Sequence, residues 1–209
     1  MTGTRHEFSD VQSLYLPIAA VVFAVVVGAT AFAVVRYRAR PGRQARPTRD
    51  RNALEAVIAL VLAAIVVVLV TVTFKADANI TDLGRHGRPG FRVDVLAFRW
   101  GWQFTYPSLP GVVDRTRPNT PPVLHVPART TVRFRLHTED VVHAFWVPAV
   151  RYKADAWPDT VRTFDLTFDE GQAISGHCAQ YCGLKHSDMT FTVEAMAPAE
   201  FRAWAARAR

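Results

Sequence analysis

Apolar residues are concentrated in two uninterrupted blocks near the start of the chain. Residues 14–35 contain no charged side chain, and neither do residues 56–74. At about 1.5 Å per residue, a helix of either length can cross a hydrocarbon layer about 30 Å thick. The pattern therefore predicts a transmembrane hairpin over residues 1–75, with spans at about 14–35 and 54–74.

The pattern changes after Lys75, where prolines become frequent and apolar residues begin to alternate with polar ones. This period-two alternation is typical of strands with one buried face, and it is clear in three segments: 91–98, 131–137 and 162–168. Short strands separated by Pro and Gly turns predict an all-β sandwich or small barrel over 76–197. A tail that opens with Pro198 predicts a short closing helix over 198–209.

Positive charge is concentrated in the connector between the two apolar blocks. The chain has 209 residues and a net charge of +7, and the segment 36–51 holds seven arginines against one acid. The positive-inside rule keeps such a connector on the cytoplasmic side, so we expect both termini and the β domain outside a prokaryotic cell membrane. Because the rest of the chain is nearly neutral, the basic composition does not indicate a nucleic-acid partner.

A cleaved signal peptide is the alternative interpretation of the first block. Such a peptide has an apolar stretch of about 7–15 residues followed by a small-residue cleavage site. Here the block is longer, and Arg36, Tyr37 and Arg38 follow it. These features favour a retained span that anchors the chain in the lipid bilayer.

Candidate metal ligands gather in one short segment, 176–189, which reads Gly-His-Cys-Ala-Gln-Tyr-Cys-Gly-Leu-Lys-His-Ser-Asp-Met. We expect this segment to be a loop between strands at 164–168 and 190–193. It contains two thiols, an imidazole and a thioether, at Cys178, Cys182, His186 and Met189. Soft sulfur ligands favour copper, and a sulfur–nitrogen site that includes methionine is more typical of copper than of zinc.

Other interpretations of this loop stay open on the residues alone. Cys178 and Cys182 could form a disulfide in an oxidising compartment. A zinc site of two cysteines and two histidines is possible, but it would leave Met189 without a role. A c-type haem attachment is excluded, because it needs two residues between the cysteines and a histidine directly after the second.

A further histidine, His143, lies 35 residues before Cys178, inside an apolar run. An imidazole without a partner is poorly accommodated in apolar surroundings. Taken alone, His143 would be interpreted as a hydrogen-bonded core residue. Next to a copper-type loop, it is a candidate ligand from an earlier strand.

These features closely resemble subunit II of the haem–copper oxidases, the cytochrome c oxidase type that carries the binuclear copper A (CuA) centre. The resemblance covers nearly the whole chain, and it includes the hairpin, the cysteine loop and three further segments: 100–106, 140–143 and 153–158. It implies a two-helix transmembrane hairpin followed by an all-β cupredoxin-like Greek-key barrel.

The resemblance also implies a ligand set for two copper ions. Cys178 and Cys182 would bridge both metals; His143 and Met189 would complete one, and His186 with the backbone carbonyl of Gln180 the other. Bridging thiolates on a rigid barrel would keep the geometry nearly unchanged between oxidation states.

Two residues outside the ligand set match positions with family roles. Trp100 aligns with the tryptophan that accepts electrons from cytochrome c, although it could instead be a core or membrane-interface aromatic. Glu55, at the edge of the second span, matches a glutamate at the entrance of a proton pathway into the catalytic subunit. A helix N-terminal acid stabilised by the helix dipole is the alternative for Glu55.

The sequence departs from the family pattern at several positions. Gln180 stands where the family has a magnesium-binding glutamate, and a neutral amide is a weaker ligand for that cation, so a magnesium site is doubtful. Residues 158–160 read Pro-Asp-Thr instead of Pro-Gly-Arg, which removes an arginine expected near the haem propionates. Domains of this family typically present an acidic face to a basic cytochrome c, whereas this β domain is slightly basic overall. Either its acids cluster locally or the electron donor is a different cytochrome. The acids in question are Asp77, Asp82, Asp94 and Asp114.

The expected function is that of a non-catalytic electron-transfer subunit. It would accept electrons from cytochrome c, or from a tethered cytochrome c domain, and pass them to haem in subunit I for reduction of O2 to water. Subunit III is a further expected partner.

The alternatives to this function are the CuA subunit of a nitric-oxide reductase or another divergent haem–copper enzyme, and an exterior copper-delivery metallochaperone. A quinol-oxidase subunit lacks the copper ligands, and a metal-free membrane domain would leave their spacing to coincidence.

Overall fold

A computed structural model of the chain describes residues 3–38, 42, 51–82, 89–118, 120–171 and 173–208. The chain divides into two compact units. One unit is a helical hairpin of residues 8–77, and the other comprises residues 78–209 together with residues 1–7.

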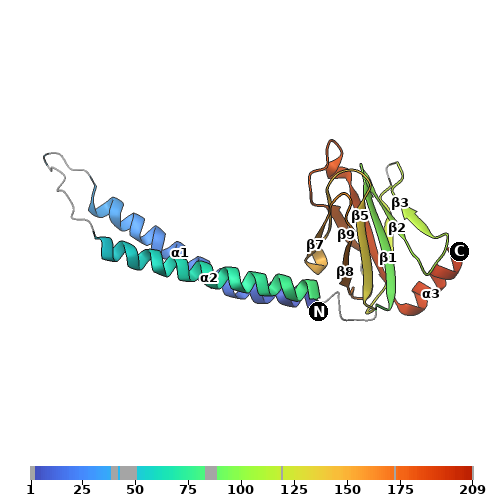
Figure 1. Ribbon diagram of the computed structural model, residues 1–209, viewed down its shortest axis with the longest axis horizontal. Coiled ribbons are helices and arrows are strands. Elements are labelled where there is room, and N and C mark those ends of the chain that lie inside the picture. The colour runs from blue at the N-terminus through green and yellow to red at the C-terminus, as the bar shows by residue number, and fades with distance from the viewer. Residues whose placement is uncertain are drawn as a thin grey trace. The chain divides into compact units, whose positions relative to one another are not determined.

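The hairpin is formed by two long helices that lie side by side, α1 (Gly3–Arg36) and α2 (Asn52–Asp82) (Figure 1). Both are long and apolar enough to cross a membrane, with candidate spans at Arg5–Arg36 and Asn52–Asn79. The Tyr15 hydroxyl donates a hydrogen bond to the carbonyl of Leu69 at 3.0 Å and therefore links the helices. Of the predicted basic connector, residues 39–41 and 43–50 lie outside the described residues.

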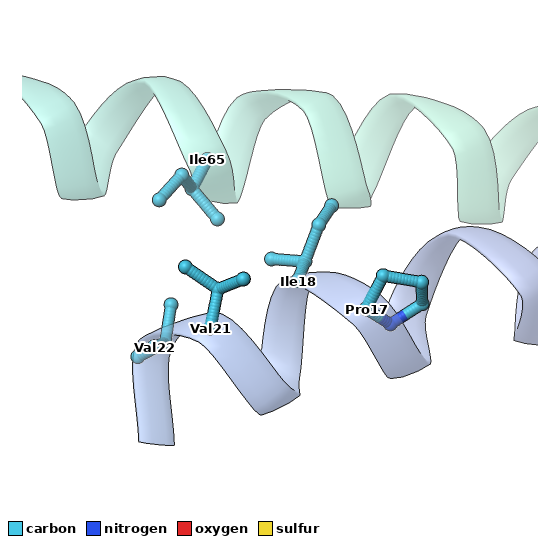
Figure 2. A pocket seen from close by; sticks show the side chains of 5 residues that line it. All are labelled: Pro17, Ile18, Val21, Val22 and Ile65. Carbon is cyan, nitrogen blue, oxygen red and sulfur yellow. The ribbon is translucent and has the colours of Figure 1, made fainter. Parts of the chain in front are cut away.

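An apolar groove lies between the two helices of the hairpin. Figure 2 shows the five side chains that line it: Pro17, Ile18, Val21 and Val22 from α1, and Ile65 from α2. Pro17 has no backbone N–H, so it cannot bond the carbonyl one turn earlier. None of these five side chains has chemistry suited to a redox or catalytic role, so the functional site lies elsewhere.

The second unit is a sandwich of two five-stranded sheets, followed by helix α3 (Pro198–Arg207). The first sheet contains, in spatial order, β3 (Val113–Arg115), β2 (Gly101–Thr105), β1 (Phe91–Phe98), β5 (Val132–Thr138) and β8 (Arg162–Leu166). The second contains β4 (Val123–Pro127), β10 (Thr190–Met196), β9 (Ala173–Cys178), β6 (His143–Val147) and β7 (Tyr152–Ala156). Neighbouring strands are antiparallel except for the parallel pairs β1–β5 and β4–β10.

Aromatic rings from both sheets fill the space between them. The ring centroids of Trp102 and Phe191 lie 5.3 Å apart, and those of Phe134 and Phe145 lie 5.8 Å apart. All four side chains are fully buried. Offset and edge-to-face rings pack favourably at such distances, so the core is a rigid support for the loops at its ends.

The predicted fold class is confirmed: two apolar helices precede a cupredoxin-like β sandwich. The strand predicted at 91–98 has the observed bounds, whereas the one predicted at 162–168 ends at Leu166. The prediction that Cys178 lies in a loop directly after a strand ending at 168 is wrong, because β9 (Ala173–Cys178) intervenes. Its buried face consists of Ile174, Gly176 and Cys178, a weak apolar signal in the sequence.

Candidate metal centre

Three candidate ligands are held at one end of the second sheet by strand pairing. Cys178 is the last residue of β9, His143 is the first residue of β6, and Met189 directly precedes β10. Cys178 pairs in register with Phe145, and its N–H donates to the Met189 carbonyl at 2.9 Å. Cys182 completes the site from the loop between β9 and β10.

The thiols and the first histidine form a compact, buried group. Ligand atoms of His143, Cys178 and Cys182 all lie within 4.8 Å of one another. The two Sγ atoms are 4.0 Å apart, and the Cys178 Sγ is 3.8 Å from the His143 Nδ1. Three soft or borderline ligands within this distance can share a metal site.

The remaining predicted donors surround the same two sulfur atoms. The His186 Nδ1 lies 3.5 Å from the Cys182 Sγ, and the Met189 Sδ lies 3.8 Å from it. The backbone carbonyl oxygen of Gln180 lies 3.3 Å from the Cys178 Sγ. The structure therefore brings all six predicted donor groups together.

The sulfur geometry separates the interpretations that the sequence left open. A disulfide needs an S–S distance of about 2.0 Å, whereas Cys178 and Cys182 are free and their sulfurs are 4.0 Å apart. A zinc site would not use Met189, yet this side chain is buried with its sulfur directed at Cys182. The donor set of two thiols, two imidazoles, a thioether and a carbonyl fits copper.

The two thiols have opposite pKa shifts. Burial raises the pKa of Cys178, but hydrogen bonds to His143 and to the backbone at Ala144 and Gln180 outweigh this and lower it to about 7. Burial and the adjacent negative charge of Cys178 raise the pKa of Cys182 to about 12. Both thiols can ionise together only if cations offset the repulsion, so the pair is suited to hold metal.

A carboxylate orients the first histidine. The Nε2 of His143 lies 2.8 Å from the Asp140 Oδ1, which leaves Nδ1 directed at Cys178. Burial raises the pKa of Asp140, but hydrogen bonds from His143 and from the backbone N–H groups of Val141 and Arg99 outweigh it and lower the value to about 2. A ligating histidine commonly has such a partner on its second nitrogen.

Trp100 contacts the cysteine loop directly. Its Nε1 donates to the carbonyl of Cys182 at 3.2 Å, and its half-buried ring packs against the core. Gly183 has a φ of +116°, and a Cβ there would lie 3.3 Å from the Trp100 ring. Glycine at this position satisfies both the backbone conformation and the close approach of the ring.

Trp102 contacts the site through its indole N–H as well as through its ring. The ring is fully buried, and its Nε1 donates to the Met189 carbonyl at 3.4 Å. Its centroid lies 6.5 Å from that of His143. A period-two pattern predicts which residues are buried, but it does not predict which loop carbonyl a buried indole will bond.

Glu55 belongs to the hairpin unit and is not part of this cluster. It is exposed in the first turn of α2, where its backbone N–H bonds the Arg51 carbonyl. Its roles in a proton pathway and at the helix dipole both stay predictions.

Gln180, where the family has a magnesium-binding glutamate, is exposed. The weak magnesium site expected from its neutral side chain stays a prediction.

Two of the acids considered in the sequence, Asp94 and Asp114, have local partners in the sandwich. Asp94 lies 3.6 Å from Arg135. Asp114 accepts a hydrogen bond from the Tyr106 hydroxyl at 2.8 Å and lies 3.0 Å from the Nδ1 of His125. Each of these two carboxylates therefore has a local partner, and the nature of the electron donor stays a prediction.

The sandwich and its converging thiol, imidazole and thioether groups define a cupredoxin-like domain with a copper-type site. The family model of the cytochrome C oxidase subunit II periplasmic domain matches residues 119–196, a range that includes every predicted copper ligand. The resemblance to the cytochrome c oxidase subunit II family that the sequence predicted is confirmed over this range.

Two relatives show how far the similarity extends. Cytochrome c oxidase subunit 2 of Bacillus subtilis is 34% identical over 154 residues, which cover 71% of this chain and 41% of that protein. The probable cytochrome c oxidase subunit 2 of Streptomyces avermitilis is 29% identical over 219 residues, which cover 87% of this chain and 67% of that protein. The chain thus spans roughly half of these longer relatives.

Solved structures show the same fold. The periplasmic domain of cytochrome oxidase subunit II from Bradyrhizobium japonicum superimposes with a TM-score of 0.54 at 22% identity, covering 58% of this chain and 95% of that one. A subunit II captured as a mixed disulfide intermediate with a thioredoxin-like protein superimposes with a TM-score of 0.51 at 21% identity. The match covers 58% of this chain and 92% of that one. Together with the two apolar helices, these findings support a membrane protein with an exterior β domain.

Proposed function

We propose that the chain is the electron-accepting subunit of a membrane haem–copper oxidase. It accepts electrons from a cytochrome c, or from a tethered cytochrome c domain, and passes them to haem in a separate subunit I that reduces O2 to water. The observation that carries this proposal is the convergence of six donor groups around the Cys178 and Cys182 sulfurs. We place this domain and both termini on the exterior side of a prokaryotic cell membrane, with subunit III as a further partner.

The donor set supports a binuclear CuA centre. Cys178 and Cys182 would be shared by both copper ions; His143 and Met189 would complete the ligands of one, and His186 and the Gln180 carbonyl those of the other. A copper pair held there would supply one-electron oxidation and reduction. The chain contributes fixed ligand positions, because strand ends carry His143 and Cys178 and the aromatic core supports them. A site built on rigid elements reorganises little when its charge changes.

Burial of the ligands argues against a copper-delivery role. The side chains of His143, Cys178, Cys182 and Met189 are buried, and His186 is partly exposed. A delivery protein must release its metal to a partner, which requires ligands that the partner can reach. Buried ligands with supporting hydrogen bonds favour a resident cofactor.

We propose that Trp100 is the electron-accepting residue on the surface of the domain. Its indole is half-buried and is joined to the Cys182 carbonyl by a single hydrogen bond. A side chain that is partly exposed and also bonded to a ligand residue offers a short route from an external donor to the site.

The Trp100→Phe variant of the copper-loaded full chain tests this proposal. The bonded indole is lost, so we expect electron uptake from reduced cytochrome c to slow by about tenfold or more, equivalent to about 1.4 kcal/mol of added barrier. Rapid-mixing absorbance measures the rate, and copper content and the visible spectrum should not change. Trp146→Phe is the matched control, because Trp146 is an exposed tryptophan on β6. Equal rates in both variants would contradict the role of Trp100.

A further inference from the structure

One carboxylate touches both the candidate copper site and the turn that carries Trp100. The Oδ1 of Asp140 lies 2.8 Å from the His143 Nε2. The Oδ2 accepts the backbone N–H of Arg99 at 2.7 Å and lies 3.4 Å from the Nε of the same arginine. Arg99 directly precedes Trp100, so a single side chain joins a ligand to the electron-accepting residue.

The segment around Asp140 is itself held in place. Its Oδ1 also accepts the Val141 N–H at 2.6 Å and the Thr138 hydroxyl at 3.3 Å. The side chain is 19% exposed, and the His143 ring that it contacts is fully buried. Both carboxylate oxygens therefore have several donors in a largely desolvated position, where charge-assisted hydrogen bonds are strong.

We propose that Asp140 is a positioning residue for electron transfer, which fixes the His143 ring at the copper site and the Arg99–Trp100 turn with one carboxylate. This inference rests on the proposed function. Its consequence is that the orientation of the ligand and the placement of the electron-accepting indole are coupled through Asp140.

An amide cannot perform this task, although it has nearly the same shape. The carboxylate accepts hydrogen bonds on both sides, from His143 and from the Arg99 N–H. The amide of Asn has one accepting oxygen and one donating nitrogen, so either the imidazole or the Arg99 N–H would face another donor. The substitution also removes a negative charge next to the imidazole, which weakens its donation to a metal.

The test compares Asp140→Asn with Glu139→Gln in the full copper-loaded chain. Glu139 is the exposed neighbour of Asp140, so its substitution removes the same charge without changing the carboxylate contacts. For Asp140→Asn we expect copper affinity to fall about 10–100-fold, the usual effect of losing such a partner. At full copper occupancy we also expect a higher reduction potential and slower electron uptake. Glu139→Gln should change none of these.

A double-mutant comparison tests the coupling itself. If Asp140 positions Trp100, Asp140→Asn should slow electron uptake less in a Trp100→Phe background than in the wild type. Thr138→Val removes the hydroxyl contacts to the Asp140 Oδ1, the Val141 carbonyl and the Asp140 N–H, and leaves the carboxylate in place. It should act in the same direction with a smaller effect, and it replaces Asp140→Asn if that chain does not fold.

Two results would overturn the inference. One is that Asp140→Asn at full occupancy behaves like Glu139→Gln; the other is that its effect on the rate is the same with and without Trp100. A wild-type chain that lacks a copper pair would instead contradict the proposed function, so the two failures are distinguishable.

Discussion

Cys182→Ser should abolish the copper pair, with bound copper falling from two ions to at most one in each chain. The Cys182 sulfur is central to the site: it lies within 4.0 Å of the Cys178 Sγ, the His186 Nδ1 and the Met189 Sδ. A hydroxyl is a hard and weakly acidic ligand, so it cannot replace a bridging thiolate. Metal analysis and EPR of the full chain measure the loss.

Ala179→Ser is the matched control for this variant. It places a hydroxyl in the same loop, next to Cys178, without removing a ligand. We expect copper content and spectrum close to those of the wild type. A Cys182→Ser chain that keeps both coppers and their shared-electron spectrum would show that this thiol is not a bridging ligand.

Trp102→Ala should destabilise the β domain by about 3–5 kcal/mol, the range observed when a buried aromatic is truncated. The ring is fully buried and lies within 6 Å of the Phe145 and Phe191 rings, centroid to centroid. Its loss also leaves the Met189 carbonyl without the indole hydrogen bond. Denaturant unfolding of the copper-free full chain, followed by circular dichroism, measures the change.

Trp102→Phe separates packing from the hydrogen bond. Phenylalanine restores most of the buried apolar volume but offers no N–H to Met189, so we expect a smaller loss of stability together with weaker copper binding. If the free energy of unfolding of Trp102→Ala stayed within about 1 kcal/mol of the wild-type value, the result would contradict close packing around Trp102. Surface substitutions usually produce changes of that size or less.

The fold followed from patterns that depend on local sequence alone. Two charge-free blocks of about twenty residues predicted the helices, and strict alternation predicted strand 91–98 with its observed bounds. Strand β9 was missed because Gly176 and Cys178 are two of the three residues on its inward face, and neither is a strong strand former. Gly176 is needed there, since a Cβ would lie 2.1 Å from the Phe191 ring.

Some ligands of the site were easier to predict than others. The spacing of Cys178, Cys182, His186 and Met189 indicated a copper loop, because all four residues lie close together in the sequence. His143 was a candidate only because a copper-type loop follows it in the sequence, and the pairing of β6 with β9 explains how it reaches that loop.

The supporting contacts of Asp140 and Trp102 were not predicted at all. Asp140 meets Arg99 across 41 residues, and Trp102 meets Met189 across 87. Such hydrogen bonds depend on how the two sheets and their end loops are placed in space. A pattern of polar and apolar residues carries no information about pairings of this kind.

The central claim is that this chain holds a pair of copper ions that share one unpaired electron. The most direct measurement is copper analysis of the full chain, purified in detergent and loaded with copper, combined with EPR and visible absorption. The account predicts two coppers in each chain, a purple colour and a hyperfine pattern from one electron spread over two copper nuclei. A single copper with a mononuclear spectrum, or a metal-free chain with oxidised Cys178 and Cys182, would contradict it.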